Sequence, residues 1–219
     1  MQPAELVKEM VTVSHGNFKR VRELVEAHPS LAKASWDWGF GDWEAAIDAA
    51  SHVGNREIAE YLIANGARPT LFTAAMLGQL EIVKGLIAAH PGVQRLAGPH
   101  SISLLAHARN GGAAAKDVYQ YLESLGDAGS PVPVPISDEE LNGLAGVYQF
   151  GSGATERIEI QASKGQLLFA RAGTTPRGLV HMGNDAFYPA GASAVRIQFK
   201  GSTLTVHDPE PMLVATKAR

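Results

Sequence analysis

Eight histidines are the residues of this sequence with the widest chemical range, because an imidazole can serve as acid, base or metal ligand near neutral pH. Cysteine is absent. This excludes disulfides, thiolate zinc sites and a cysteine nucleophile. No histidine lies four residues from another, and no His-Glu-x-x-His or Gly-x-Ser-x-Gly sequence occurs, so none of the common local signatures of a catalytic site is present.

One histidine-based site can still be assembled from distant parts of the chain. His100 and His107, together with Asp37, Asp42 or Asp48, could form a metal-dependent or acid–base site across neighbouring structural units. The alternative is that each histidine is structural and finds ordinary hydrogen-bond partners. Because the spacing matches no ligand pattern, the sequence favours the second interpretation and predicts a protein without metal, cofactor or catalytic residue.

The tryptophans form the most unusual local feature. All three lie in the segment Trp36-Asp37-Trp38-Gly39-Phe40-Gly41-Asp42-Trp43, which has no regular period and is expected to be a loop. Tryptophan is favoured at binding hot spots, whereas a cluster of aromatic rings can also seal the end of a helical array. The candidate binding residues are Trp36, Asp37, Trp38, Phe40, Asp42, Trp43, His52, Met76 and Arg109.

Composition narrows the class of protein. Apolar residues make up 45% and charged residues 19% of the 219 residues, which is typical of a folded globular chain. Residues 1–130 carry the whole net charge of −3 and residues 131–219 are neutral, so neither part is basic and nucleic acid is not an expected partner. No apolar stretch is long enough to span a bilayer. The compartment stays open: cytoplasmic by default, or exported if a signal peptide preceded Met1.

Internal repeats set the expected architecture of the first half. Four segments share a helical apolar stripe aligned on Leu24, Leu62, Leu86 and Leu122. A glycine stands eight residues before three of these leucines, at Gly16, Gly54 and Gly78. Short alanine-rich helices precede Gly54 and Gly78 and occur again at 103–108. The pattern predicts helix pairs joined by tight glycine turns.

These helix pairs resemble ankyrin repeats, with the best match from Thr70 to Ile87 and the next from Ala46 to Ala67. The Pro and His of the ankyrin signature are absent, and the leucines are 38, 24 and 36 residues apart, where a regular repeat has about 33. The resemblance implies a repeat domain over residues 1–126 that recognises a protein or peptide through its concave face.

The pattern changes after a proline-rich linker at residues 127–137. Residues 138–219 alternate apolar and polar positions between turn signals, which predicts seven or eight short strands in an antiparallel barrel or sandwich. The segments 144–148, 165–167, 185–188 and 195–199 resemble the lipocalin-like β-domain appended to some serine hydrolases of the β-lactamase class. That resemblance implies an accessory role without activity.

The sequence therefore predicts an α + β protein of two domains. The favoured function is a non-catalytic binding or scaffold protein that uses the concave ankyrin face and the tryptophan-rich loop. The first alternative is a small apolar ligand bound in the lipocalin-like domain. The second is an enzyme with a His/Asp site on the repeat surface.

Overall fold

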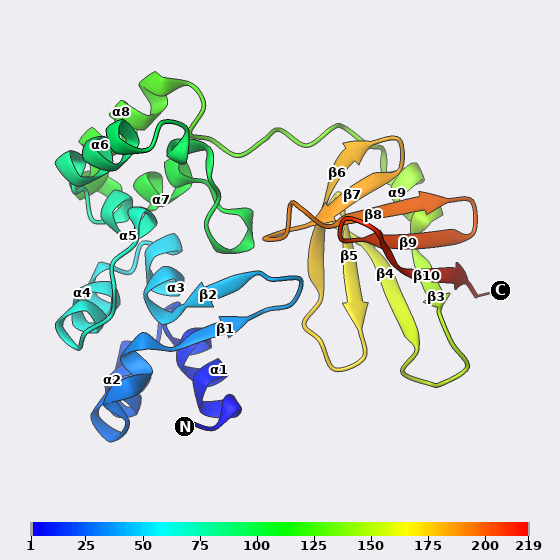
Figure 1. Ribbon diagram of the computed structural model, residues 1–219, viewed down its shortest axis with the longest axis horizontal. Helices are drawn as coiled ribbons and strands as arrows, with labels where there is room; N and C mark the ends of the chain where they lie inside the picture. The colour runs from blue at the N-terminus through cyan, green and yellow to red at the C-terminus, as the bar shows by residue number, and fades with distance from the viewer. Residues whose placement is uncertain (1, 219) are drawn as a thin grey trace. The chain divides into compact units, whose positions relative to one another are not determined.

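The computed structural model describes residues 2–218, which form two compact units (Figure 1). The helical unit runs up to Trp38 and from Asp42 to Ser130, and the β unit comprises Gly39–Gly41 and the chain from Pro131 onward. The β unit is a closed antiparallel barrel. The expectation of helices followed by a small antiparallel β-barrel is therefore confirmed.

The helical unit is a series of short helices joined by turns and 3₁₀ segments. Its elements are α1 (Ala4–Val13), α2 (Phe18–Ala27), η1 (Pro29–Lys33), α3 (Ala46–His52), α4 (Arg56–Ala64), α5 (Leu71–Met76), α6 (Leu80–Ala89), η2 (Val93–Arg95), η3 (Pro99–Ser101), α7 (Leu104–Asn110), η4 (Gly112–Ala115) and α8 (Lys116–Leu125). Asn17, Asn55, Thr70 and Ser103 cap α2, α4, α5 and α7, each accepting a backbone N–H of the first turn.

Two of the predicted turn glycines allow the helix pairs to approach closely. Gly54 and Gly78 have φ angles of 77° and 76°. A Cβ at Gly54 would lie 2.2 Å from the carbonyl oxygen of Asn110, and one at Gly78 would lie 2.0 Å from that of Ala114. Any other residue would push the neighbouring pair away, so glycine is required both by the turn and by the packing.

The tryptophan segment is a β-hairpin, so its prediction as an irregular loop was wrong. Strand β1 (Ser35–Asp37) pairs with β2 (Trp43–Ala45), and Trp36 lies opposite Glu44. Phe40 is at the tip with a φ of 58°. Trp36 and Trp38 pack against the core around α1 to α4, below the amine of Lys8. Asp42 and Glu44, both buried, belong to the helical unit.

The β unit begins with one helix and continues as eight strands. The elements are α9 (Asp138–Leu144), β3 (Gly146–Gln149), β4 (Arg157–Ser163), β5 (Gln166–Arg171), β6 (Arg177–Gly183), β7 (Ala186–Pro189), β8 (Arg196–Lys200), β9 (Thr203–His207) and β10 (Pro211–Lys217). The strands follow one another around the barrel, and β10 closes it between β9 and β3. Helix α9 was not predicted; Ser137 and Glu140 cap it reciprocally.

The barrel interior is filled by its own side chains. Tyr148, Phe187 and Phe199 are almost fully buried, and the Phe199 ring lies 5.7 Å and 5.6 Å from the other two ring centroids. An eight-stranded barrel is just wide enough for such a core. Within residues 2–218, no helix has both the length and the apolarity needed to cross a membrane.

Candidate metal centre

Glu44 is the centre of a group of polar side chains inside the helical unit. It is fully buried at the middle of β2. Its Oε2 accepts a hydrogen bond of 2.7 Å from the Trp38 indole N–H. Its Oε1 lies 3.5, 3.5 and 3.4 Å from the Nε2 atoms of His15, His52 and His100. No described residue donates a hydrogen bond to Oε1, so one buried carboxylate oxygen faces three imidazole nitrogens without a bonded partner.

Two of the three imidazoles are oriented so that Nε2 faces Glu44. His15 donates its Nδ1–H to the carbonyl of Thr12 at 2.9 Å, and His100 donates its Nδ1–H to Asp42 Oδ2 at 2.8 Å. Because Nδ1 donates to these acceptors, Nε2 is the atom left facing Glu44, and it offers a lone pair there once the ring has lost its second proton. A carboxylate or carbonyl behind the ring is the usual support of a metal-binding histidine.

The backbone around His100 is strained in a way that serves this arrangement. His100 and Ser101 both have φ angles of 60°, a left-handed conformation that is costly for residues other than glycine. Asp42 holds the turn by accepting the His100 backbone N–H at 3.0 Å as well as the ring N–H. One buried carboxylate thus fixes both the backbone and the ring of His100.

Behind Glu44 lie two further buried histidines. His52 ends α3, and among residues 2–218 neither of its ring nitrogens has a hydrogen-bond partner. His107, fully buried in α7, donates its Nδ1–H to the carbonyl of Ser103 at 2.8 Å, while its Nε2 has no partner among the same residues. Buried polar atoms almost always have partners. Several such atoms gathered in one place therefore make this interior a candidate binding site.

The charges of the group follow from burial and proximity. Burial raises the pKa of Glu44, but His100 and His15 outweigh it and hold the pKa at about 2. Burial lowers the pKa of His100, but Asp42 and Glu44 outweigh it and raise the pKa to about 9. Burial lowers the pKa of His52 to about 4, so this ring is neutral at pH 7. Asp42 and Glu44, which lie on either side of the ring, therefore favour the protonated form of His100.

The group also has the dimensions of a metal site. One ligand atom each from His15, Glu44 and His100 lie within 4.8 Å of one another. In a tetrahedral zinc site with bonds of about 2.0–2.1 Å, neighbouring ligand atoms are about 3.4 Å apart. The distances from Oε1 to the imidazole nitrogens match this value. Two histidines and a carboxylate suit zinc and other divalent first-row metals, and do not suit calcium or magnesium.

The structure brings some of the candidate residues predicted from the sequence together and places others apart. His100 and Asp42 come together as considered there, whereas Asp48 instead accepts hydrogen bonds from Thr70 and the Ala45 backbone. Asp37 ends β1. Trp43 has 63% of its surface exposed and can contact a partner. Arg109 is exposed over the Tyr119 ring.

Three named residues lie inside the protein instead of on a binding face. Met76 is fully buried in the core, His52 is 7% exposed, and Asp42 is 2% exposed. As surface contacts these three assignments were wrong, because each side chain is covered by neighbouring elements. His107 is also set apart: it contacts the rings of His52 and Phe72 and is not part of the compact ligand group.

Sequence reasoning missed Glu44 and His15. His15 precedes the first turn glycine by one residue, and His52 precedes the next by two. Equivalent positions of stacked repeats lie side by side. This register was a usable signal, whereas Glu44 had none, because its burial depends on the hairpin.

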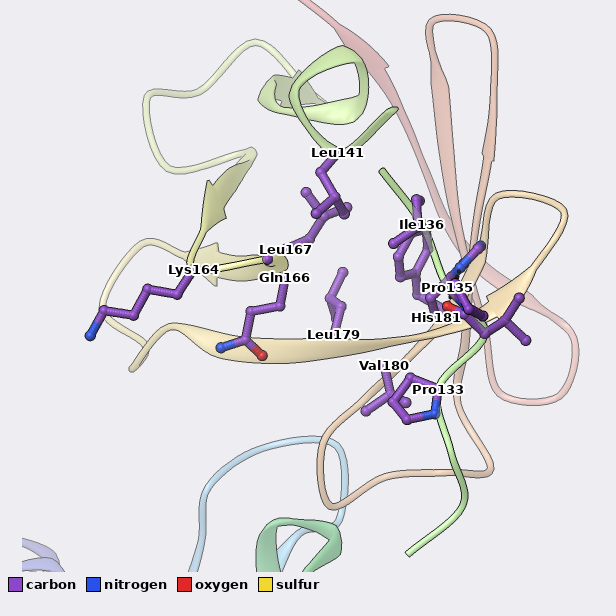
Figure 2. A pocket seen from close by; sticks show the side chains of 13 residues that line it. Pro133, Pro135, Ile136, Leu141, Lys164, Gln166, Leu167, Leu179, Val180 and His181 are labelled. Carbon is purple, nitrogen blue, oxygen red and sulfur yellow. Dashed lines mark hydrogen bonds between the residues drawn. The ribbon is translucent and has the colours of Figure 1, made fainter. Parts of the chain in front are cut away.

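The β unit contains a separate cavity of about 480 Å³ at one mouth of the barrel (Figure 2). Ile136 from the linker, Leu141 from α9 and Leu179 from β6 converge on it, and Lys164 and Gln166 lie at one side. Leu141, Leu179 and Phe187 line the cavity and also belong to the core of the β unit. Comparison with protein-family models and with curated proteins found no match to this chain. The candidate metal centre around Glu44 is therefore supported by its geometry alone.

Proposed function

We propose that the helical unit binds one divalent transition-metal ion, with zinc as the type case, through His15, Glu44 and His100. The observation that carries the proposal is the buried Glu44 Oε1 atom, which accepts no hydrogen bond from residues 2–218 and lies at tetrahedral-edge distances from imidazole Nε2 atoms. A divalent ion also balances the two buried carboxylates, Asp42 and Glu44, once His100 releases its proton.

Metal analysis tests this proposal directly. Protein purified without chelator is expected to contain one zinc, iron, nickel or manganese per chain, and chelator-treated protein is expected to take up one Zn²⁺ in calorimetry. Glu44→Gln keeps the shape and removes the charge, so it should lose the ion. Glu81→Gln, an exposed glutamate on α6, is the matched control. Equal zinc binding by Glu44→Gln and the parent would overturn the proposal.

A second candidate function is recognition of a protein or peptide by the helical unit as a non-catalytic scaffold. We propose that the helix pairs are ankyrin-like repeats and that the β1–β2 hairpin corresponds to their recognition loop. Trp43 supports this, because a tryptophan exposed to 63% beside two anchored tryptophans offers a large rigid contact surface. Capture of a partner from lysate by the parent but not by Trp43→Ala would support it, with Ile82→Ala, an exposed apolar residue of α6, as the control.

The cavity at the barrel mouth supports a third proposal. The β unit would bind a small apolar ligand there, against Ile136, Leu141 and Leu179. Its mostly apolar lining and its volume fall in the range of ligand pockets. A fluorescent apolar probe should bind the parent and the remote variant Val147→Arg on β3, and it should not bind Leu179→Arg. Equal binding by both variants would contradict it.

A further inference from the structure

We propose that His52 is the fourth ligand of the metal, so that the protein itself closes the coordination shell and the ion acts as a structural clamp of the helical unit. This inference rests on the metal site proposed above. It goes further by naming the complete donor set, three imidazoles and one carboxylate, and the role of the ion.

The first observation is the state of the His52 ring. It is buried, and neither ring nitrogen has a hydrogen-bond partner among the described residues. A buried imidazole without partners destabilises the folded state, because its polar atoms lose their hydrogen bonds to water and gain none in return. Ligation would satisfy one nitrogen with the strongest partner that the site can offer.

The second observation is position. His52 Nε2 is as far from Glu44 Oε1, at 3.5 Å, as His15 Nε2 is. The His52 ring also contacts both other rings, with centroids 4.8 Å from His15 and 5.5 Å from His100. His52 does not belong to the compact group of three ligand atoms. A rotation of the ring toward the group would cost no hydrogen bond to any described residue, because neither ring nitrogen makes one.

The third observation is where the four residues come from. His15 lies in the turn between α1 and α2, Glu44 on β2, His52 at the end of α3 and His100 on η3. An ion bound to all four would tie together segments separated by up to 85 residues in the sequence. Four protein ligands in tetrahedral geometry are typical of structural zinc, whereas catalytic zinc keeps a position for water. The donor set therefore indicates a structural role for the ion, which would hold the four segments together.

Cobalt spectroscopy on cysteine variants tests the inference, because the natural chain has no cysteine. In Co²⁺-loaded His52→Cys, a thiolate bound to the metal gives an intense charge-transfer band in the near ultraviolet. His107→Cys is the matched control: it also replaces a buried histidine of a short helix, next to His52 but outside the contacts to Glu44. We expect the band in the first variant and none in the second.

Two further measurements keep the outcome decisive if a variant folds poorly. X-ray absorption of the Zn²⁺-loaded parent should show three imidazoles and one oxygen. His52→Ala should bind Zn²⁺ about 100-fold more weakly or worse, since even partners outside the coordination shell are worth about 10–100-fold. A parent with two imidazoles and bound water, or His52→Cys without the band, would overturn the fourth ligand and leave the metal site standing. A parent that binds no metal would overturn both.

Discussion

The two units of this protein bury different kinds of side chains. The interior of the barrel is apolar, and Arg177 is the only charged residue buried in it among residues 2–218. The helical unit buries Asp42, Glu44, Asp48, His52 and His107 in addition to its apolar core. Charged and titratable groups are rarely buried unless they are paired or bind metal.

This difference indicates where chemistry is located in the molecule. In the β unit the buried Arg177 donates to the carbonyl of Ala190 at 2.9 Å, and His181 Nε2 is the single buried side-chain atom without a partner among the described residues of that unit. In the helical unit Asp48 is explained in the same way by Thr70, whereas Glu44 Oε1, His52 and His107 Nε2 have no such partner within the described chain. Most of the buried side-chain atoms without a partner therefore lie in the helical unit, where they gather around Glu44, and this favours the helices as the place of the proposed metal site.

The largest expected effect concerns the barrel core. Phe199→Ala removes a buried ring that packs on Tyr148 and Phe187, so it should lower the free energy of unfolding of the barrel by about 3–5 kcal/mol. Hydrogen exchange should rise in residues 146–217. Zinc affinity should be unchanged, because no proposed ligand lies in this unit. A matching loss of zinc binding would contradict the division of roles between the units.

Metal should stabilise the helical unit alone. At a free Zn²⁺ concentration of 100 times its dissociation constant, binding to the folded state adds about 2.7 kcal/mol. All three tryptophans belong to the hairpin beside the site, so their fluorescence reports on unfolding of this region. The midpoint followed by tryptophan should rise with zinc. No shift at saturating zinc would mean that the ion does not bind the native helices.

Removing the charge of Asp42, the carboxylate that holds His100, should weaken zinc binding without abolishing it. Asp42→Asn retains an oxygen acceptor but loses the charge opposite the His100 ring, so zinc affinity should fall about 10–100-fold. Asp127→Asn is the control, because Asp127 pairs with Arg95 and Gln94 in another part of the same unit. Calorimetry measures both. Equal affinities in the two variants would show that Asp42 has no positioning role.

The smallest effect on stability is expected at Trp43. Its ring is mostly exposed, so Trp43→Ala should change the free energy of unfolding by no more than about 0.5 kcal/mol and leave zinc affinity unaltered. Trp38→Phe, by contrast, removes the N–H that binds Glu44 Oε2 and should weaken zinc binding. Denaturant titration and calorimetry compare the two variants. Strong destabilisation by Trp43→Ala would place its ring in the core and remove the basis for partner recognition.

Periodicity in the sequence was enough to find most elements of the fold. The helices around Leu24, Leu62, Leu86 and Leu122 are present as α2, α4, α6 and α8, and the alternating segments are strands of the barrel. Each of these elements depends on which face of a local segment is apolar, and this can be read from neighbouring residues. The turn glycines Gly54 and Gly78 were found for the same reason.

The candidate metal centre depends on tertiary structure. His15, Glu44, His52 and His100 share no local spacing, and the hairpin that buries Glu44 lies in a segment whose composition predicts a loop. They meet because stacked helix pairs bring equivalent turns together and because Asp42 holds η3 against the hairpin. The sequence by itself determined the helices, the strands and the lack of thiol chemistry. Only tertiary packing decided which imidazoles face one carboxylate, since coordination depends on distances in space and not on separation along the chain.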